Sequence, residues 1–207
     1  MALSAHEVNK LKQAPPVEGV LPVVLQRWSV RSYADRDVPP AELAKIFEAA
    51  RWAASARNEQ PWRFIVGVRN TSTYQKIFDT LMEHNRPWAS TAPVLILGIT
   101  STKFASDGLN NPYCLYDLGA VSTTIALQAT AQGLATRTVA SFNHDAARNA
   151  FGIPEDIAIG TVIALGYQGE PAALGSEKQI ALETASRGRK PLNELTFSSW
   201  GEPIELA

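Results

Sequence analysis

Two arginines and a serine alternate near the start of the chain, where Arg27, Ser29 and Arg31 are each separated by one residue. Guanidinium groups form charge-assisted, often bidentate hydrogen bonds to phosphate, and a serine hydroxyl adds a further donor. The three side chains can therefore converge on one anion. Either arginine could instead form a surface ion pair with Asp35 or Asp37, which follow closely. Taken alone, the spacing leaves both roles open.

A second candidate is a polar loop that follows a strongly predicted helix and begins with the small residues Ala54, Ser55 and Ala56. Small side chains allow a backbone to approach a flat ring closely. Asn58 and the glutamine two residues later can donate and accept hydrogen bonds along the polar edge of such a ring. Asparagine, glutamine and proline are equally common in ordinary helix-to-strand connections. The loop by itself does not distinguish a ring-binding segment from an ordinary helix-to-strand connection.

A third candidate lies near the C-terminus, where Arg187, Arg189 and Lys190 place three cations within four residues. Such a cluster can clamp a phosphate, and it is equally typical of a solvated tail. Its significance depends on whether the fold brings it close to Arg27 and Arg31.

The order of these motifs along the chain resembles that of the nitroreductase family of flavoproteins. That family shows an Arg-x-Ser-x-Arg element, followed some two dozen residues later by a Pro-Ser-x-x-Asn-x-Gln-Pro-Trp element. The resemblance runs from Gln26 to Leu192. It includes Asn85–Trp88 before Ala92–Val94, Gly133–Thr136 leading to Phe142, Ala164–Tyr167 and the basic segment Arg187–Pro191.

The resemblance implies that FMN lies in a cleft between two intertwined subunits of a homodimer. The residues that it places at the phosphate and ribityl chain are Arg27, Trp28, Ser29, Arg31, Arg187 and Arg189. Those that it places against the ring, with the first four coming from the partner subunit, are Ala54, Ser55, Ala56, Asn58, Asn85, Val139, Ala140 and Ser141. Asn85 would bind the pyrimidine edge, and an amide of the last three would donate to flavin N5. Two departures are Trp28, where the family usually has a basic residue, and Ala54, where it usually has proline.

The resemblance also implies ping-pong chemistry, in which NAD(P)H delivers hydride to N5 and a small electron-poor acceptor then takes it. No side chain is assigned as a catalytic acid, because the cofactor carries the chemistry. The expected acceptor is a nitroaromatic, a quinone or an enone. Reductive dehalogenation, flavin fragmentation, a non-catalytic flavin-binding protein and an anion-binding module without flavin remain alternatives.

Periodicity and turn signals predict an α+β (α/β) domain. The resemblance implies that its sheet is central, mostly antiparallel and flanked by helices. Helices are predicted at Ser4–Ala14, Leu21–Trp28, from Pro39 to Ala53, Thr71–Glu83, Asn111–Gln132 and Asp145–Phe151. Strands are predicted at Trp62–Arg69, Pro93–Thr100, Ala135–Phe142 and Ile157–Tyr167, and the remainder is predicted to be irregular. The nearly apolar helix Asn111–Gln132 is expected to lie in the core or at a subunit interface.

Composition limits the other possibilities. With 19 Lys+Arg against 20 Asp+Glu, the net charge is near zero and gives no overall electrostatic attraction to nucleic acid or to an anionic membrane. Cys114 is the only cysteine, and the three histidines lack metal-ligand spacing, so no metal site is expected. A Rossmann fingerprint is absent, as are a signal peptide and an apolar stretch long enough to span a membrane. We therefore expect one cytoplasmic domain over residues 1–207, with a flavin-binding core at about 20–192 and a tail at 193–207.

Overall fold

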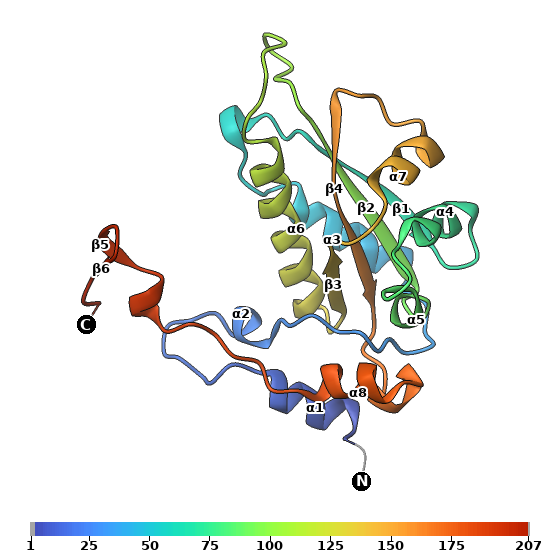
Figure 1. The fold of residues 1–207 in the computed structure, drawn as a ribbon, viewed down its shortest axis with the longest axis vertical. Helices are drawn as coiled ribbons and strands as arrows, with labels where there is room; N and C mark the ends of the chain where they lie inside the picture. Colours follow the sequence, from blue (N-terminus) through green and yellow to red (C-terminus); the bar gives the residue numbers. More distant parts are fainter. Residues whose placement is uncertain (1–2, 207) are drawn as a thin grey trace.

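A four-stranded sheet with helices on both faces organises the computed structural model, which describes residues 3–206 (Figure 1). Its strands are β1 (Trp62–Val68), β2 (Val94–Ser101), β3 (Ala135–Val139) and β4 (Ile157–Gly166). They are ordered β1-β2-β4-β3, and every neighbouring pair is antiparallel. The prediction of an α+β fold with an antiparallel sheet is confirmed. β3 is an edge strand, so one side of its backbone is not used by the sheet.

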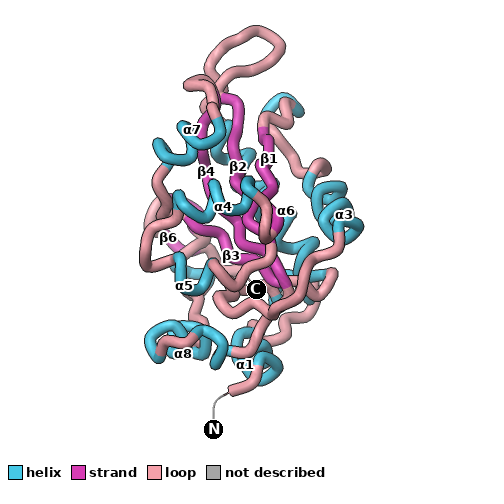
Figure 2. Tube along the Cα trace, turned by 90° about the vertical axis from the view of Figure 1, so that its right-hand side faces the viewer, coloured by secondary structure: helices cyan, strands magenta, loops and turns pink. Residues whose placement is uncertain are grey.

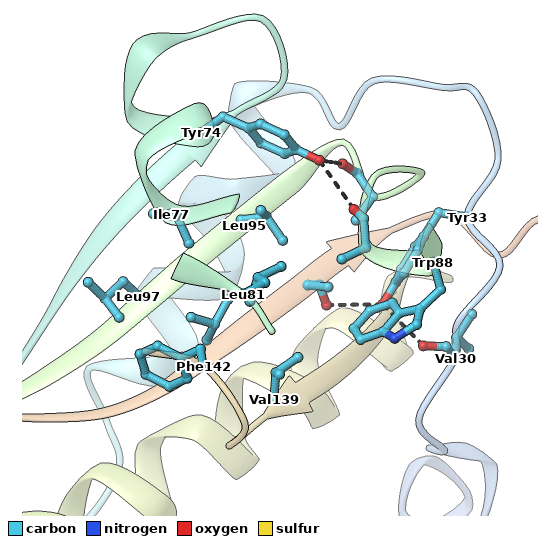
Figure 3. Close-up of a cluster of buried hydrophobic side chains, with 14 of the residues drawn as sticks. Val30, Tyr33, Tyr74, Ile77, Leu81, Trp88, Leu95, Leu97, Val139 and Phe142 are labelled. Atoms are coloured by element: carbon cyan, nitrogen blue, oxygen red, sulfur yellow. Dashed lines mark hydrogen bonds between the residues drawn. The ribbon is translucent and has the colours of Figure 1, made fainter. Parts of the chain in front are cut away.

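The central strand β2 is buried on both faces, as its continuous apolar sequence predicts. Val94 and Ile96 pack into a core beneath α3 (Pro40–Ala50) and α6 (Cys114–Ala131). Leu95 and Leu97 point the opposite way. They join a second core, which includes Leu81, Trp88, Val139 and Phe142 (Figure 3).

Helices α4 (Ser72–Thr80) and α7 (His144–Phe151) cover that second face of the sheet. The smaller helices are α1 (Ala5–Lys12), α2 (Pro22–Gln26), α5 (Arg86–Ala89) and α8 (Glu177–Thr184). α1 and α8 pack side by side below one end of the sheet, as Figures 1 and 2 both show. Single 3-10 turns are η1 (Ala56–Asn58), η2 (Pro171–Leu174) and η3 (Leu192–Glu194).

Local signals define several helix ends as the sequence predicts. Ser4 and Glu7 form both hydrogen bonds of a capping box at the start of α1. The hydroxyl of Thr71 accepts from the Tyr74 amide and begins α4. Gly152 ends α7 with a φ of 61°, a conformation that costs glycine least.

The prediction of irregular structure after residue 167 is wrong, because α8 and a short hairpin of β5 (Phe197–Ser199) and β6 (Glu202–Pro203) lie there. α8 has no apolar stripe that repeats with the helical period, since its one fully buried side chain is that of Glu183. Several other elements end earlier than predicted: α1 stops at Lys12, α2 at Gln26, α3 at Ala50, α4 at Thr80 and β3 at Val139.

The chain after α8 extends away from the sheet, and β5 and β6 lie apart from the rest of the molecule (Figure 1). This tail exposes Leu192, Leu195, Phe197, Trp200, Ile204 and Leu206. Between residues 3 and 206 no helix combines the length and the apolar character that crossing a membrane requires.

Candidate functional site

The residues after α2 form an extended segment beside the edge strand β3, where Ser29 makes a parallel bridge with Thr136. Side chains of an extended chain alternate in direction. Trp28 is accordingly buried, whereas Arg27, Ser29 and Arg31 remain half-buried or exposed. The structure therefore brings the three polar residues of the first motif onto one face of the segment.

Trp28 faces the opposite way, and its indole Nε1 donates to the side-chain oxygen of Asn9 at 2.8 Å. The Lys12 ammonium lies over the same ring, 5.1 Å from its centroid. The indole is therefore a packing group, and only the backbone of Trp28 is left to face a ligand.

The basic C-terminal motif reaches the first motif across more than 150 residues of sequence. Arg187 donates to the carbonyl oxygens of Arg27 and Leu25, the latter at 2.8 Å. Burial lowers the pKa of the Arg27 guanidinium, and the charge of Arg189 lowers it further. The pKa of Arg187 is also lowered by burial first and then by the other two cations.

These three arginines repel one another without a carboxylate to balance them. Among the described residues, no salt bridge includes Arg27, Arg187 or Arg189. A cluster of cations without acidic partners is stabilised by a bound anion, and a phosphate dianion suits its charge.

The alternative of a surface ion pair with Asp35 or Asp37 is not what the structure shows. Asp35 pairs with Arg69, while the guanidinium of Arg31 lies 3.8 Å from the carboxylate of Glu183. Glu183 is fully buried in α8, and its carboxylate accepts hydrogen bonds from the Arg31 amide at 3.0 Å.

Two hollows open on either side of the C-terminal end of β3, and both are lined by Thr138 and Ala140. One has a volume of about 640 Å³ and runs along α6, with Arg27 as its cation. The other, of about 650 Å³, lies between β3, the start of α5 and α8, with Arg31 in its wall. In an edge strand, every second amide faces away from the neighbouring strand. The edge of β3 therefore offers backbone donors between two hollows.

Asn85 fixes the backbone at the end of this strand. Its side-chain nitrogen donates to the Ser141 carbonyl at 3.0 Å, and its oxygen accepts from the Trp88 indole at 3.2 Å. Arg137 lies 5.2 Å from the centroid of the same indole and donates to the Ser29 carbonyl at 3.3 Å. Val139 is buried, so only its backbone faces the site.

The second sequence motif lies elsewhere in the chain. The Ala56 amide donates to the carboxylate of Asp117 in the first turn of α6, at 3.2–3.3 Å. Arg27 shares a cavity with Thr130 and Gly133, which lie at the opposite end of that helix. At 1.5 Å per residue, the separation of 13 residues between Asp117 and Thr130 corresponds to about 20 Å along α6. Within one chain, the hollow along α6 therefore lies between the arginines and the loop that contains Ala54, Ser55, Ala56 and Asn58.

The loop is held in an unusual conformation, because Arg57, Asn58 and Gln60 have φ values of 54°, 54° and 49°. Such values are uncommon outside glycine and cost conformational energy. Arg57 is fixed by an ion pair with Asp107 at 3.0 Å and by packing over the ring of Phe104. These contacts therefore offset the conformational cost and hold the loop in one shape.

Several residues at the site were not singled out by the sequence motifs. They are Arg137 and Thr138 in β3, and Ser176, Lys178, Gln179, Leu182 and Glu183 at or in α8. An arginine inside a predicted, otherwise apolar strand was a usable signal for Arg137. Nothing local marked α8, because its link to Arg31 depends on tertiary structure. No group of three potential metal ligands occurs within residues 3–206.

The fold and site define an α+β protein with a cluster of arginines beside the outer edge of its sheet, and comparison with known proteins identifies its class. The Nitroreductase family matches residues 24–167, and the chain belongs to this family. A protein of Archaeoglobus fulgidus named as an NADH dehydrogenase/NAD(P)H nitroreductase is 32% identical over 158 residues, covering 73% of this chain and 86% of that protein. A 4-nitrobenzoate reductase of Nocardioides is 29% identical and covers 91% of this chain and 93% of its own.

Solved structures give the same result. An oxidoreductase containing FMN superposes with a TM-score of 0.82 at 26% identity, covering 93% of this chain and 97% of its own. A nitroreductase-type protein of Desulfovibrio desulfuricans in complex with FMN has a TM-score of 0.72 at 23% identity, and the match covers 92% of this chain and 100% of that chain. The family and the fold expected from the motifs are confirmed.

Proposed function

We propose that this protein is a homodimeric oxidoreductase that binds FMN and uses NAD(P)H to reduce a small electron-poor molecule. The observation that carries the proposal is the arginine cluster, which comes from both ends of the chain, lies beside the outer edge of β3 and has no acidic partner within residues 3–206. Family membership and the FMN-containing relatives support the choice of FMN.

The phosphate would be bound by Arg27, Arg187 and Arg189, with the Ser29 hydroxyl as a neutral donor. Each guanidinium contributes charge-assisted hydrogen bonds, which are stronger than those between neutral groups. Burial and neighbouring cations lower the pKa values of Arg27 and Arg187, and this fits the role, because a dianion would relieve the repulsion.

The ring would lie against the C-terminal end of β3, where Thr138 and Ala140 leave room on both faces. When bound, FMN supplies hydride transfer through its N5 atom, and the chain supplies orientation and electrostatics. An amide of Val139, Ala140 or Ser141 would donate to N5. Asn85 holds the Ser141 carbonyl in place and has a second side-chain N–H for the pyrimidine edge.

Arg31 and Arg137 line the hollow between β3, the start of α5 and α8, and their charges give this hollow a positive potential. Burial lowers the pKa of the Arg137 guanidinium, and the nearby charge of Arg31 lowers it further. Both groups would favour negative charge on the ring edge and so stabilise a reduced, anionic ligand. NAD(P)H and the acceptor would use the remaining open face in turn, which is consistent with the absence of a Rossmann fingerprint.

A homodimer is proposed on two grounds. The loop at Ala54–Asn58 contacts the first turn of α6, Arg27 lies beside its last turn, and the hollow along α6 separates them within one chain. The exposed side of α6 carries Leu115 and Tyr116, and the tail exposes further apolar residues that a second copy would cover.

The proposal is tested by an absorbance spectrum of the purified protein before and after anaerobic addition of NADH or NADPH. Expected are flavin bands that bleach with reductant and return when a nitroaromatic or quinone is added. A colourless protein that does not take up FMN would indicate an anion-binding module. A yellow protein that stays oxidised would indicate a flavin-binding protein without this activity.

A further inference from the structure

Glu183 is a carboxylate fully removed from water on a helix that is otherwise largely exposed. Its side chain has 0% exposure, whereas most of its neighbours in α8 are accessible. Burial raises the pKa of its carboxyl, although two amides and the charges of Arg31 and Lys12 oppose that shift. An acidic group in such a place is destabilising unless donors replace its lost hydration.

Those donors are two successive backbone amides of the first motif. The Arg31 amide lies 3.0 Å from each carboxylate oxygen, and the Ser32 amide lies 3.1 Å from one of them. The Arg31 guanidinium completes the contact at 3.8 Å. The other charges that face Glu183 are Lys12 of α1 and Arg137 of β3.

This contact fixes one end of the segment that carries Arg27, Ser29 and Arg31. The other end is fixed by Arg187, which donates to the Arg27 carbonyl. Both attachments come from α8 and the residues just after it, below the end of the sheet in Figure 1. The direction of alternate side chains depends on the backbone between the two attachments.

We propose that Glu183 is a positioning residue for the segment that would bind the phosphate: by holding the Arg31 and Ser32 amides, it fixes the backbone direction that turns Arg27 and Ser29 toward the phosphate. This inference rests on the proposed function, and Glu183 itself is not placed in contact with the ligand.

The test compares FMN with riboflavin, which is the same ring system without the phosphate. Affinities of both for the apoprotein are measured by flavin fluorescence for the wild type and Glu183→Gln. The matched control is Glu177→Gln, an exposed carboxylate in the same helix. The glutamine turns an N–H toward amides that also donate, so the segment loosens. We expect the preference for FMN over riboflavin to fall about tenfold or more in Glu183→Gln and to stay unchanged in the control.

Three results would be decisive against the inference. An equal loss for both ligands would mean a general structural role. A stronger preference for FMN would mean that Glu183 acts only as an unfavourable charge near the phosphate, and no change would mean that it has no role. If the wild type binds neither ligand, the proposed function fails instead.

Hydrogen exchange on the wild-type apoprotein tests the same contact without a substitution, and so covers the case in which Glu183→Gln does not fold. The amides of Arg31 and Ser32 should be protected to the level of β4. Exchange at the rate of a free loop would overturn the inference.

Discussion

Arg27, Arg187 and Arg189 come together only through the tertiary structure, since each alone resembles an ordinary surface cation. The sequence allowed the arginines to be selected by spacing and by their order relative to the other motifs. It did not show that Arg187 donates to the carbonyl of Arg27, or that within residues 3–206 no carboxylate forms a salt bridge with the group. Pairing depends on long-range contacts, which local spacing does not encode.

The double variant Arg27→Ala with Arg189→Ala tests these residues directly. Charge-assisted hydrogen bonds contribute about 1.5–3 kcal/mol each, so losing two should weaken FMN binding by about a hundredfold or more. Gel filtration followed by an absorbance spectrum should show a colourless protein with an unchanged elution volume. Lys190→Ala is the matched control, because Lys190 lies in the same tail but pairs with Glu194 at 3.8 Å. Tight flavin retention by the double variant would contradict the phosphate assignment.

At the scale of elements, the four strands and the longer helices were predictable because burial of one or both faces determines the spacing of their apolar residues. β2 is apolar throughout since both of its faces are covered, and α3 and α4 show the apolar spacing of amphipathic helices. α8 was not predictable, because its buried face is polar and is satisfied by a distant segment.

The packing of α4 on β1 provides a test of element positions. A Cβ added at Gly67 would lie 2.5 Å from the Tyr74 Cα and 2.7 Å from its backbone nitrogen, so the helix must move. Gly67→Ala should therefore reduce the free energy of unfolding by about 1–3 kcal/mol, as overpacking does elsewhere. Gly98→Ala on β2 is the control, because its nearest new neighbour is a Leu118 methyl at 3.4 Å. Urea unfolding followed by circular dichroism measures both, and equal stability of the two variants would contradict the close approach.

At the scale of the whole molecule, exposed apolar side chains lie on the N-terminal segment, at the start of α6 and along the tail. Trp200 is 95% exposed and Tyr116 is 78% exposed, which is unusual for large aromatic side chains in a single folded chain. The exposure of these side chains could not be predicted from the sequence, because the same apolar residue types occur in the core of a subunit and on a surface that a second subunit covers. This exposure is consistent with a second copy of the chain as the covering surface.

Removal of residues 191–207 should weaken the dimer while leaving Arg187 and Arg189 in place. The deleted segment includes Leu192, Leu195, Phe197 and Trp200, all exposed within one chain. Because burial of apolar surface contributes about 25 cal/mol per Å², loss of these contacts should raise the dimer dissociation constant at least about tenfold. Sedimentation velocity over a range of concentrations measures the change, and circular dichroism confirms the fold. An unchanged dimer would mean that the tail lies elsewhere.

The shared site can be tested by mixing two inactive variants. The first, Arg27→Ala with Arg189→Ala, lacks the phosphate cluster, and the second, Ala54→Trp, fills the place that the partner loop would give to the ring. Ala54 is exposed in the single chain, so the tryptophan is tolerated there before a partner binds.

If each site takes its arginines from one subunit and its loop from the other, a mixed dimer contains one intact site and one that carries both defects. Random subunit exchange makes about half of the dimers mixed, so about a quarter of all sites should regain FMN and reductase activity. Sites built within one chain would regain neither FMN nor activity, because every site would still contain either the altered arginines or the altered loop of its own chain. The separation of Ala56 and Arg27 along α6 favours the first outcome.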